Sequence, residues 1–182
     1  FWNRASTQRP YALMRVNLTE LGLIFPTRSV RSTASRLYAQ SPQTLLFQDY
    51  VRVFFSTRLG PDEDGAYVSV VDFVDFTHDF SEILDVSAHH VLGAGDIGCF
   101  DEHGVFPLSP FRSQDGRHLA LTTGWSRRTS VSVETGIGLC ESLDGGLTFQ
   151  RLGPGPVLTA NSSDPFLVCD GHVQFDGDRY LM

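Results

Sequence analysis

The chain has 182 residues, 41% of which are hydrophobic, and it carries a formal net charge of −7 at pH 7. This apolar content is enough for one folded core, and the negative charge argues against nucleic acid and anionic membrane surfaces as partners. No apolar run approaches the roughly 20 residues of a transmembrane helix, so we predict no membrane partner.

The first 13 residues differ in composition from the rest of the chain. They include Arg4, Arg9 and Pro10 and contain no continuous apolar stretch, so they do not resemble a signal peptide. We interpret residues 1–13 as a non-native or disordered extension and Met14 as a candidate start. Residues 14–182 are then the folded part, and a cytoplasmic location is the default expectation.

One unit of sequence occurs twice in full and starts a third time. In the first copy, an apolar run after Pro42 is followed by a polar break and by a second apolar run from Arg52. The same order recurs after Pro107 and after Pro165, at an offset of roughly 60 residues, which is the sequence sign of a repeat architecture. We expect an inner strand to start near each of the three prolines.

Each unit is predicted to consist of β-strands, because its apolar runs are short, rich in Val, Phe, Leu and Thr, and bounded by Gly, Asp, Asn and Pro. In the second unit, four strands fit at about 105–112, 117–125, 131–141 and 147–152. Four-stranded units arranged radially are the blades of a β-propeller, which closes with about four to eight of them. We therefore predict an all-β fold, with about two and a half blades of a longer propeller.

The sharpest local motif spans residues 142–149, with the sequence SLDGGLTF. It fits S-x-D-x-G-x-T-aromatic and resembles the Asp-box of sialidases and other propellers. In such a turn Asp144 accepts backbone hydrogen bonds and Phe149 packs beneath the loop, so we predict a structural role and not a catalytic one. Residues 76–80 are a degenerate counterpart in the first unit.

Carboxylates precede the predicted inner strands of the second and third units. Asp101 and Glu102 lie before Pro107, and Asp164 lies before Pro165. If these strands begin at one channel mouth, the carboxylates converge there. A pair of carboxyl groups is the usual apparatus for cleaving a glycosidic bond. The alternative is that Asp101 and Asp164 only hold turns before strands.

A family resemblance rests on several segments of the chain. They are QSPQT at 40–44, VRVFFSTR at 51–58, GCFDEHGVFP at 98–107, GWSRR at 124–128 and GPGPVL at 153–158. Together they resemble five-bladed propeller proteins similar to glycoside hydrolase families 32, 43 and 130, and this resemblance runs from about Leu21 to Met182. It implies a sugar-processing fold, of which this chain would be the N-terminal fragment.

The resemblance also assigns roles. In families 43 and 32 an Asp before the first inner strand acts as base or nucleophile, whereas this chain has Ser41 there. The pair Asp164-Pro165 matches the Asp-Pro pattern, but in the third unit. Either the acid and base come from Asp101, Glu102 and Asp164, or the protein is not a hydrolase of the usual kind.

Candidate substrate contacts surround these carboxylates. Trp125 beside Arg127 and Arg128 would suit a sugar ring with an anionic substituent, although a solvated loop anchored by one Trp is an equal alternative. Gln40, which precedes Ser41, is a further candidate contact to the substrate. His103 could bind a hydroxyl group or serve a structural role.

The sequence predicts no metal site and no cofactor. His89 and His90 are adjacent and so lack metal-ligand spacing, and residues 62–65 look like a solvated hairpin tip and not a calcium loop. The three cysteines are widely spaced, and we interpret them as buried small hydrophobic residues.

We predict a carbohydrate-active propeller that cleaves a glycosidic bond of an oligosaccharide or polysaccharide. Glu102 or Asp164 would be the acid, and Asp101 the orienting or base carboxylate. One alternative is a non-catalytic carbohydrate-binding propeller linked to polysaccharide biosynthesis. Another is a glycoside phosphorylase, in which Arg127 and Arg128 would hold phosphate. Sialidase action is less favoured, because an Asp-box reports a fold and not a chemistry.

Overall fold

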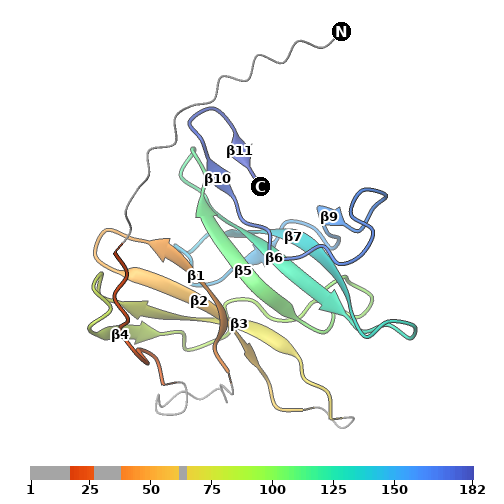
Figure 1. Cartoon of the computed structure of the whole chain (residues 1–182), viewed down its shortest axis with the longest axis horizontal. Coiled ribbons are helices and arrows are strands. Elements are labelled where there is room, and N and C mark those ends of the chain that lie inside the picture. Colours follow the sequence, from red (N-terminus) through yellow and green to blue (C-terminus); the bar gives the residue numbers. More distant parts are fainter. Residues whose placement is uncertain (1–16, 27–37, 62–64) are drawn as a thin grey trace.

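The computed structural model describes residues 17–26, 38–61 and 65–182. These residues form strands and turns and contain no helix, so the all-β prediction is confirmed (Figure 1). No helix in the described ranges could therefore span a membrane. The predicted extension at 1–13 and the acidic residues 62–64 lie outside the described residues.

The first sheet is an antiparallel meander of four strands in chain order. Its strands are β1 (Gln40–Leu46), β2 (Val51–Arg58), β3 (Ser69–Phe76) and β4 (Ile83–Val86). The central strands are rich in Val and Phe, which favour a pleated surface covered on both faces. Accordingly, every residue of β3 is buried.

The second sheet repeats this order. Its strands are β5 (Val105–Arg112), β6 (His118–Ser126), β7 (Glu134–Ser142) and the short β8 (Gln150–Arg151), and β9 (Leu158–Thr159) also pairs with β7. The predicted strands at 105–112 and 117–125 agree closely with β5 and β6. The fourth strand is shorter than the predicted 147–152, because the turn that starts at Ser142 occupies the first half of that segment.

The third unit is a small hairpin of β10 (Gln174–Phe175) and β11 (Tyr180–Leu181). The prediction that its first strand starts at Pro165 is wrong. Residues 165–168 form no strand, and the side chain of Phe166 is 84% exposed. A proline-led apolar run resembles a strand in sequence, but here no neighbouring strand pairs with its backbone.

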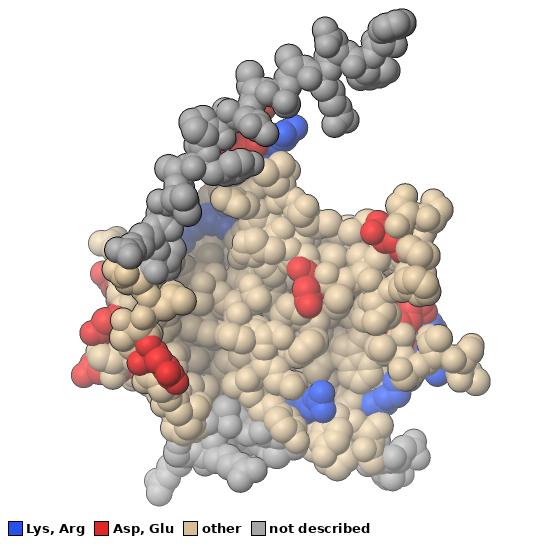
Figure 2. Space-filling view, viewed as in Figure 1, with Lys and Arg blue, Asp and Glu red and all other residues tan. Residues whose placement is uncertain are grey.

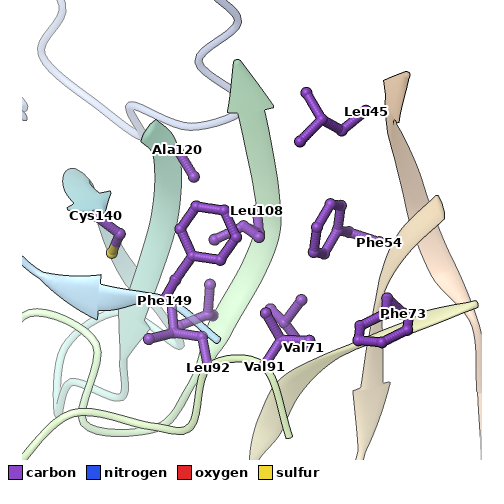
Figure 3. Packing of buried hydrophobic residues seen from close by; sticks show 11 residues of the cluster. Leu45, Phe54, Val71, Phe73, Val91, Leu92, Leu108, Ala120, Cys140 and Phe149 are labelled. Atoms are coloured by element: carbon purple, nitrogen blue, oxygen red, sulfur yellow. The ribbon is translucent and has the colours of Figure 1, made fainter. Parts of the chain in front are cut away.

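The main core lies between the four-stranded sheet β1–β4 and the five-stranded sheet β5–β9 (Figure 3). Leu45 and Phe54 point from the first sheet toward Leu108 of the second, and the ring of Phe149 meets Phe54 edge to face at 5.8 Å. Strand β5 lies against β1, β2 and β3. The inner strand of the second sheet therefore crosses the face of the first.

Part of the opposite face of the first sheet is covered by Ile24 and Phe25, while residues 17–23 are exposed. Ile24 and Phe25 pack against a second cluster that contains Val74 and Phe76, and the rings of Phe25 and Phe55 are 5.3 Å apart. Both faces of β3 are thus protected from water, which agrees with the burial of all its residues.

Candidate functional site

A pocket of about 510 Å³ opens where β1 and β5, the first strands of the two sheets, begin. The end of β2, the start of β3, the end of β6 and the start of β7 complete its walls. Its lining side chains are mainly aromatic, guanidinium or small polar groups, with one carboxylate. They include Gln40, Arg58, Tyr67, Ser69, Phe106, Thr123, Trp125, Arg127, Thr135, Cys169 and Asp170.

The indole of Trp125 is held firmly in the pocket wall. Its Nε1 donates a hydrogen bond to Oγ of Ser69 at 2.7 Å, which ties β6 to β3. The imidazole of His103 lies beside it, with ring centroids 5.7 Å apart, and the Trp125 backbone N–H donates to the carbonyl of Gly104. An aromatic side chain with fixed contacts of this kind is a ready-made binding platform, because little conformational freedom is lost when a ligand stacks on it.

Two guanidinium groups flank one tyrosine in the pocket. The Nη2 atom of Arg127 donates to the backbone oxygen of Tyr67 at 2.5 Å, and its guanidinium lies 5.3 Å from the Trp125 ring centroid. The guanidinium of Arg58 lies 5.8 Å from the Tyr67 ring centroid and 5.5 Å from that of Tyr38. The sequence analysis did not identify Arg58 or Tyr67, because they enter the pocket only when the second sheet packs on the first.

Asp170 is the carboxylate that the sequence analysis missed. Its backbone N–H donates to Oγ1 of Thr123 at 2.8 Å, and it lines both this pocket and a neighbouring one of about 460 Å³. Asp170 lies five positions before Phe175, the end of β10, and Ser41 lies five positions before Leu46, the end of β1. Both residues have a positive φ angle, which is 57° at Asp170 and 49° at Ser41. Asp170 is therefore the structural counterpart of Ser41, and counting back from the hairpin would have identified it.

Asp101 is fully buried and lies outside the pocket lining. Its Oδ2 accepts a hydrogen bond from Nε of Arg151 at 2.6 Å, and Arg151 also donates to the carbonyl of Gly93. Its Oδ1 has no hydrogen-bond partner among the described residues. This ion pair connects β8 to the loop between the two sheets, so the carboxylate has a structural role inside the protein.

Glu102 and His103 support the pocket wall from behind. Glu102 accepts a hydrogen bond from the backbone N–H of Gly98 at 2.8 Å, and its other oxygen lies 3.4 Å from Nδ1 of His103. The same Nδ1 accepts from the backbone N–H of Arg127 at 3.2 Å. The loop that carries both residues thus fixes the backbone that presents Trp125 and Arg127.

Two predicted site residues lie away from this pocket. Asp164 is exposed in a turn whose ends are joined by the Asn161 N–H and the Asp164 carbonyl, 2.9 Å apart. Arg128 forms an ion pair with Glu134 and lines a different pocket. Of the predicted residues, the structure brings Gln40, Trp125 and Arg127 together in the pocket.

The turn at 142–149 has the contacts that the sequence predicts for an Asp-box. Oδ1 of Asp144 accepts from the backbone N–H groups of Leu147 and Thr148, and its Oδ2 accepts from the Thr148 hydroxyl at 2.6 Å. The hydroxyl of Ser142 donates to Asp144, and Phe149 is buried in the main core. Since these contacts remain within the turn, they hold its shape.

The counterpart at 76–80 forms a similar turn. The hydroxyl of Thr77 donates to Oδ1 of Asp79 at 2.7 Å, at the same two-residue spacing as Ser142 and Asp144. Phe80 has a φ of 59°, where the second unit has Gly145 at 76°. Hydrogen bonds, first from the Thr77 hydroxyl, lower the pKa of Asp79 to about 2.

The cysteines are free thiols in three different environments. Cys140 is buried in the main core, as predicted, and burial raises its pKa to about 12. Cys99 is half-buried. For Cys169 the prediction of burial is wrong, because the segment that carries it crosses the pocket mouth instead of joining a sheet.

In the described ranges, no group of three or more His, Cys, Asp or Glu side chains could hold a metal ion. Figure 2 shows charged side chains on one face as small separate groups, with most of that surface neither acidic nor basic. The charged residues coloured in this view thus form no extended acidic or basic patch.

The chain is similar to an uncharacterized protein of Mycobacterium tuberculosis. The sequences from strains CDC 1551 / Oshkosh and H37Rv are each 33% identical to it over 134 residues, which is 74% of this chain and 43% of the relative. The chain thus spans less than half the length of the curated relatives it matches. No family model matches it.

Proposed function

We propose that the chain is part of a carbohydrate-binding β-propeller, with the four-stranded sheet β1–β4 and the five-stranded sheet β5–β9 as successive blades. Three features support this architecture. Both sheets are meanders in chain order, β5 packs across the first sheet, and both inner strands have a register shift near the start, at Gln40/Gln43 and Val105/Leu108. The Ser41 and Asp170 correspondence supports a third blade that starts at the same mouth.

The observation that carries the function is the fixed indole of Trp125 in a mainly apolar pocket that several polar side chains also line. Sugars present apolar C–H faces and hydroxyl edges, so a sugar site combines an aromatic platform with convergent hydrogen-bonding groups. Trp125 supplies the platform, while Gln40, Thr123 and Asp170 supply donors and acceptors around it. The pocket volume of about 510 Å³ suits one or two sugar rings.

The placement of the carboxylates favours binding over hydrolysis within this chain. Asp101 is buried against Arg151, and Asp164 lies in an exposed turn outside the pocket. Among the described residues, Asp170 is the carboxylate that lines the pocket. Because glycosidic cleavage needs two carboxyl groups flanking the bond, the described residues supply at most one of them.

Glycoside hydrolysis is the second candidate function, and Asp170 is the observation that favours it. In this version Asp170 acts as one carboxylate, and a second comes from outside the described residues. Phosphorolysis has less support, since Arg128 pairs with Glu134 and lies away from Arg127 in the pocket lining.

Tryptophan fluorescence tests the binding proposal directly. The sequence has two tryptophans, so a Trp2→Phe background leaves Trp125 as the sole indole. Neutral and acidic oligosaccharides are titrated into this 182-residue protein, and saturable changes in Trp125 emission are expected for at least one of them.

A Gln40→Ala variant in the same background should weaken the response by about three- to tenfold, because one hydrogen bond is lost. Leu143→Ala serves as the control, since Leu143 is exposed in the Asp-box turn. If no oligosaccharide changes the emission at millimolar concentration while the protein melts cooperatively, the carbohydrate-binding proposal is wrong.

A further inference from the structure

We propose that the pocket selects sugars that carry a carboxylate, with Arg58 as the principal contact to that group. This inference rests on the proposed carbohydrate-binding function and adds the ligand class. Arg58 and Arg127 both contact Tyr67, one through its ring and the other through its backbone oxygen, so two guanidinium groups lie at the same wall of the pocket.

Within residues 17–26, 38–61 and 65–182, the contacts of Arg58 are with ring faces and leave its hydrogen-bond donors available to a ligand. Its guanidinium lies over the rings of Tyr38 and Tyr67, at 5.5 and 5.8 Å from their centroids. A guanidinium group above an aromatic ring contacts that ring with its own flat face. The N–H groups of the guanidinium then point outward, in the plane of the guanidinium. A carboxylate matches this planar fork and can accept two parallel hydrogen bonds.

Arg127 has a different part in the same wall. Its bond to the Tyr67 carbonyl and its position 5.3 Å from the Trp125 ring centroid fix its charge beside the aromatic platform. These two contacts hold the Arg127 guanidinium at the Tyr67 side of the Trp125 ring. A sugar stacked on Trp125 would therefore be oriented with its acidic substituent toward the Tyr67 wall.

Asp170 adds the opposite charge at the pocket mouth. Its backbone is anchored to Thr123, and its exposed carboxylate lies on the segment that borders the neighbouring pocket. A carboxylate ligand near Asp170 would be repelled, while a sugar hydroxyl there could donate to it. Arg58 and Arg127 do not line that neighbouring pocket, so the positive and negative groups occupy different parts of the lining and favour one direction for an acidic sugar.

The test compares three probes by calorimetry with the 182-residue protein. They are a galacturonate trisaccharide, the neutral maltotriose and inorganic phosphate. We expect the uronate to bind at least tenfold more tightly than maltotriose at low salt. Arg58→Gln should weaken uronate binding by about tenfold and maltotriose binding by much less, because only the uronate loses a charged contact.

Two further variants separate this role from a general effect of charge or stability. Arg58→Lys keeps the charge but loses the planar fork, so it should restore only part of the affinity. Arg117→Gln removes an equivalent charge at the β5–β6 turn, outside the pocket lining, and should not change binding. Melting temperatures of all variants show whether each one is folded.

The outcomes distinguish the inference from the proposed function. If maltotriose binds as tightly as the uronate and Arg58→Gln changes neither, carboxylate selection is wrong and carbohydrate binding stands. If phosphate binds and neither sugar does, the pocket is an anion site and the carbohydrate-binding proposal fails as well. An equal loss of uronate affinity in Arg117→Gln would also overturn the assignment of Arg58.

Discussion

Oδ2 of Asp101 lies 2.6 Å from Nε of Arg151, although 50 positions separate the two residues in the chain. Asp101 is fully buried, and Arg151 sits on the short strand β8 at the edge of the second sheet. The ion pair thus joins the edge of this sheet to the loop that supports Trp125.

The first prediction is that Asp101 contributes to stability and not to proton transfer. Asp101→Asn should lower the free energy of unfolding by about 3 kcal/mol, because Arg151 would lose its buried partner. Urea denaturation measures this change. Asp101→Asn combined with Arg151→Met should recover part of the loss, since no uncompensated charge remains. A single variant with unchanged stability and reduced turnover would instead support a catalytic carboxylate.

The second prediction concerns Gly104, where the inter-sheet loop meets β3. A Cβ at this position would lie 2.3 Å from Oγ and 2.4 Å from the backbone oxygen of Ser69, and φ is 136°. Gly104→Ala should therefore lower the free energy of unfolding by about 2 to 4 kcal/mol. It should also shift the fluorescence emission of Trp125, whose indole donates a hydrogen bond to Ser69.

Gly98→Ala is the matched control for that substitution. Gly98 also has a positive φ of 89°, but a Cβ at this position would meet no atom within 4 Å. Gly98→Ala should lower the free energy of unfolding by only about 1 kcal/mol, through backbone strain. Equal losses in the two variants would show that close packing against Ser69 is not the cause.

Local chemistry made part of the structure predictable from sequence. The turn at 142–149 forms from its own side chains, so the motif identifies it without knowledge of the rest of the fold. The bounds of β5 follow in the same way from a run of apolar residues that ends at a polar turn. Neither feature depends on a distant partner.

The pocket was harder to predict because it forms only when the sheets pack together. Arg58 ends β2 in the first sheet, whereas Trp125 lies near the end of β6 in the second. In the third unit, Asp164-Pro165 matches the Asp-Pro pattern of the resembled families, so the sequence alone favours Asp164. The backbone instead places Asp170 at the position equivalent to Ser41. The pairing of the strands, and not the position of the proline, determines which residues of the third unit are equivalent to those of the first.

The third prediction is a loss of stability in acid that depends on Asp144. Partial burial raises the pKa of this carboxyl, but hydrogen bonds from Thr148, Ser142 and Leu147 outweigh that effect and hold the pKa below its usual value of 3.8. The carboxylate therefore stabilises the fold above about pH 4, and this contribution is lost as pH falls through the lowered pKa of the folded state.

Asp144→Ala tests this at two pH values. At pH 6 it should reduce stability by about 1 kcal/mol through lost turn hydrogen bonds, and ligand affinity should not change. At pH 2.5 the difference from the parent protein should be smaller. A variant that melts like the parent at pH 6 but loses sugar binding would contradict the structural role of Asp144.

The fourth prediction ranks the cysteines by reactivity. Burial raises the pKa of Cys140 to about 12, so its thiol should remain unmodified by iodoacetamide at pH 8 until the protein unfolds. Cys169 is exposed and should react first, although burial and then the nearby Asp170 raise its pKa. Asp170→Asn should therefore accelerate its modification, as followed by mass spectrometry. Faster labelling of Cys140 than of Cys169 would contradict the described packing.

The last prediction separates the carboxylates by their part in turnover, if the protein cleaves a glycosidic bond. Asp170 lines the pocket, whereas Asp164 is exposed outside it and Glu102 accepts a bond from the Gly98 backbone. A group that transfers a proton must reach the substrate, so Asp170→Asn should reduce kcat by about 100-fold or more. Asp164→Asn should have no effect, and Glu102→Gln should act mainly on melting temperature. Release of reducing ends from an oligosaccharide measures turnover, and a large loss in Asp164→Asn with none in Asp170→Asn would restore the role that the Asp-Pro pattern predicts for Asp164.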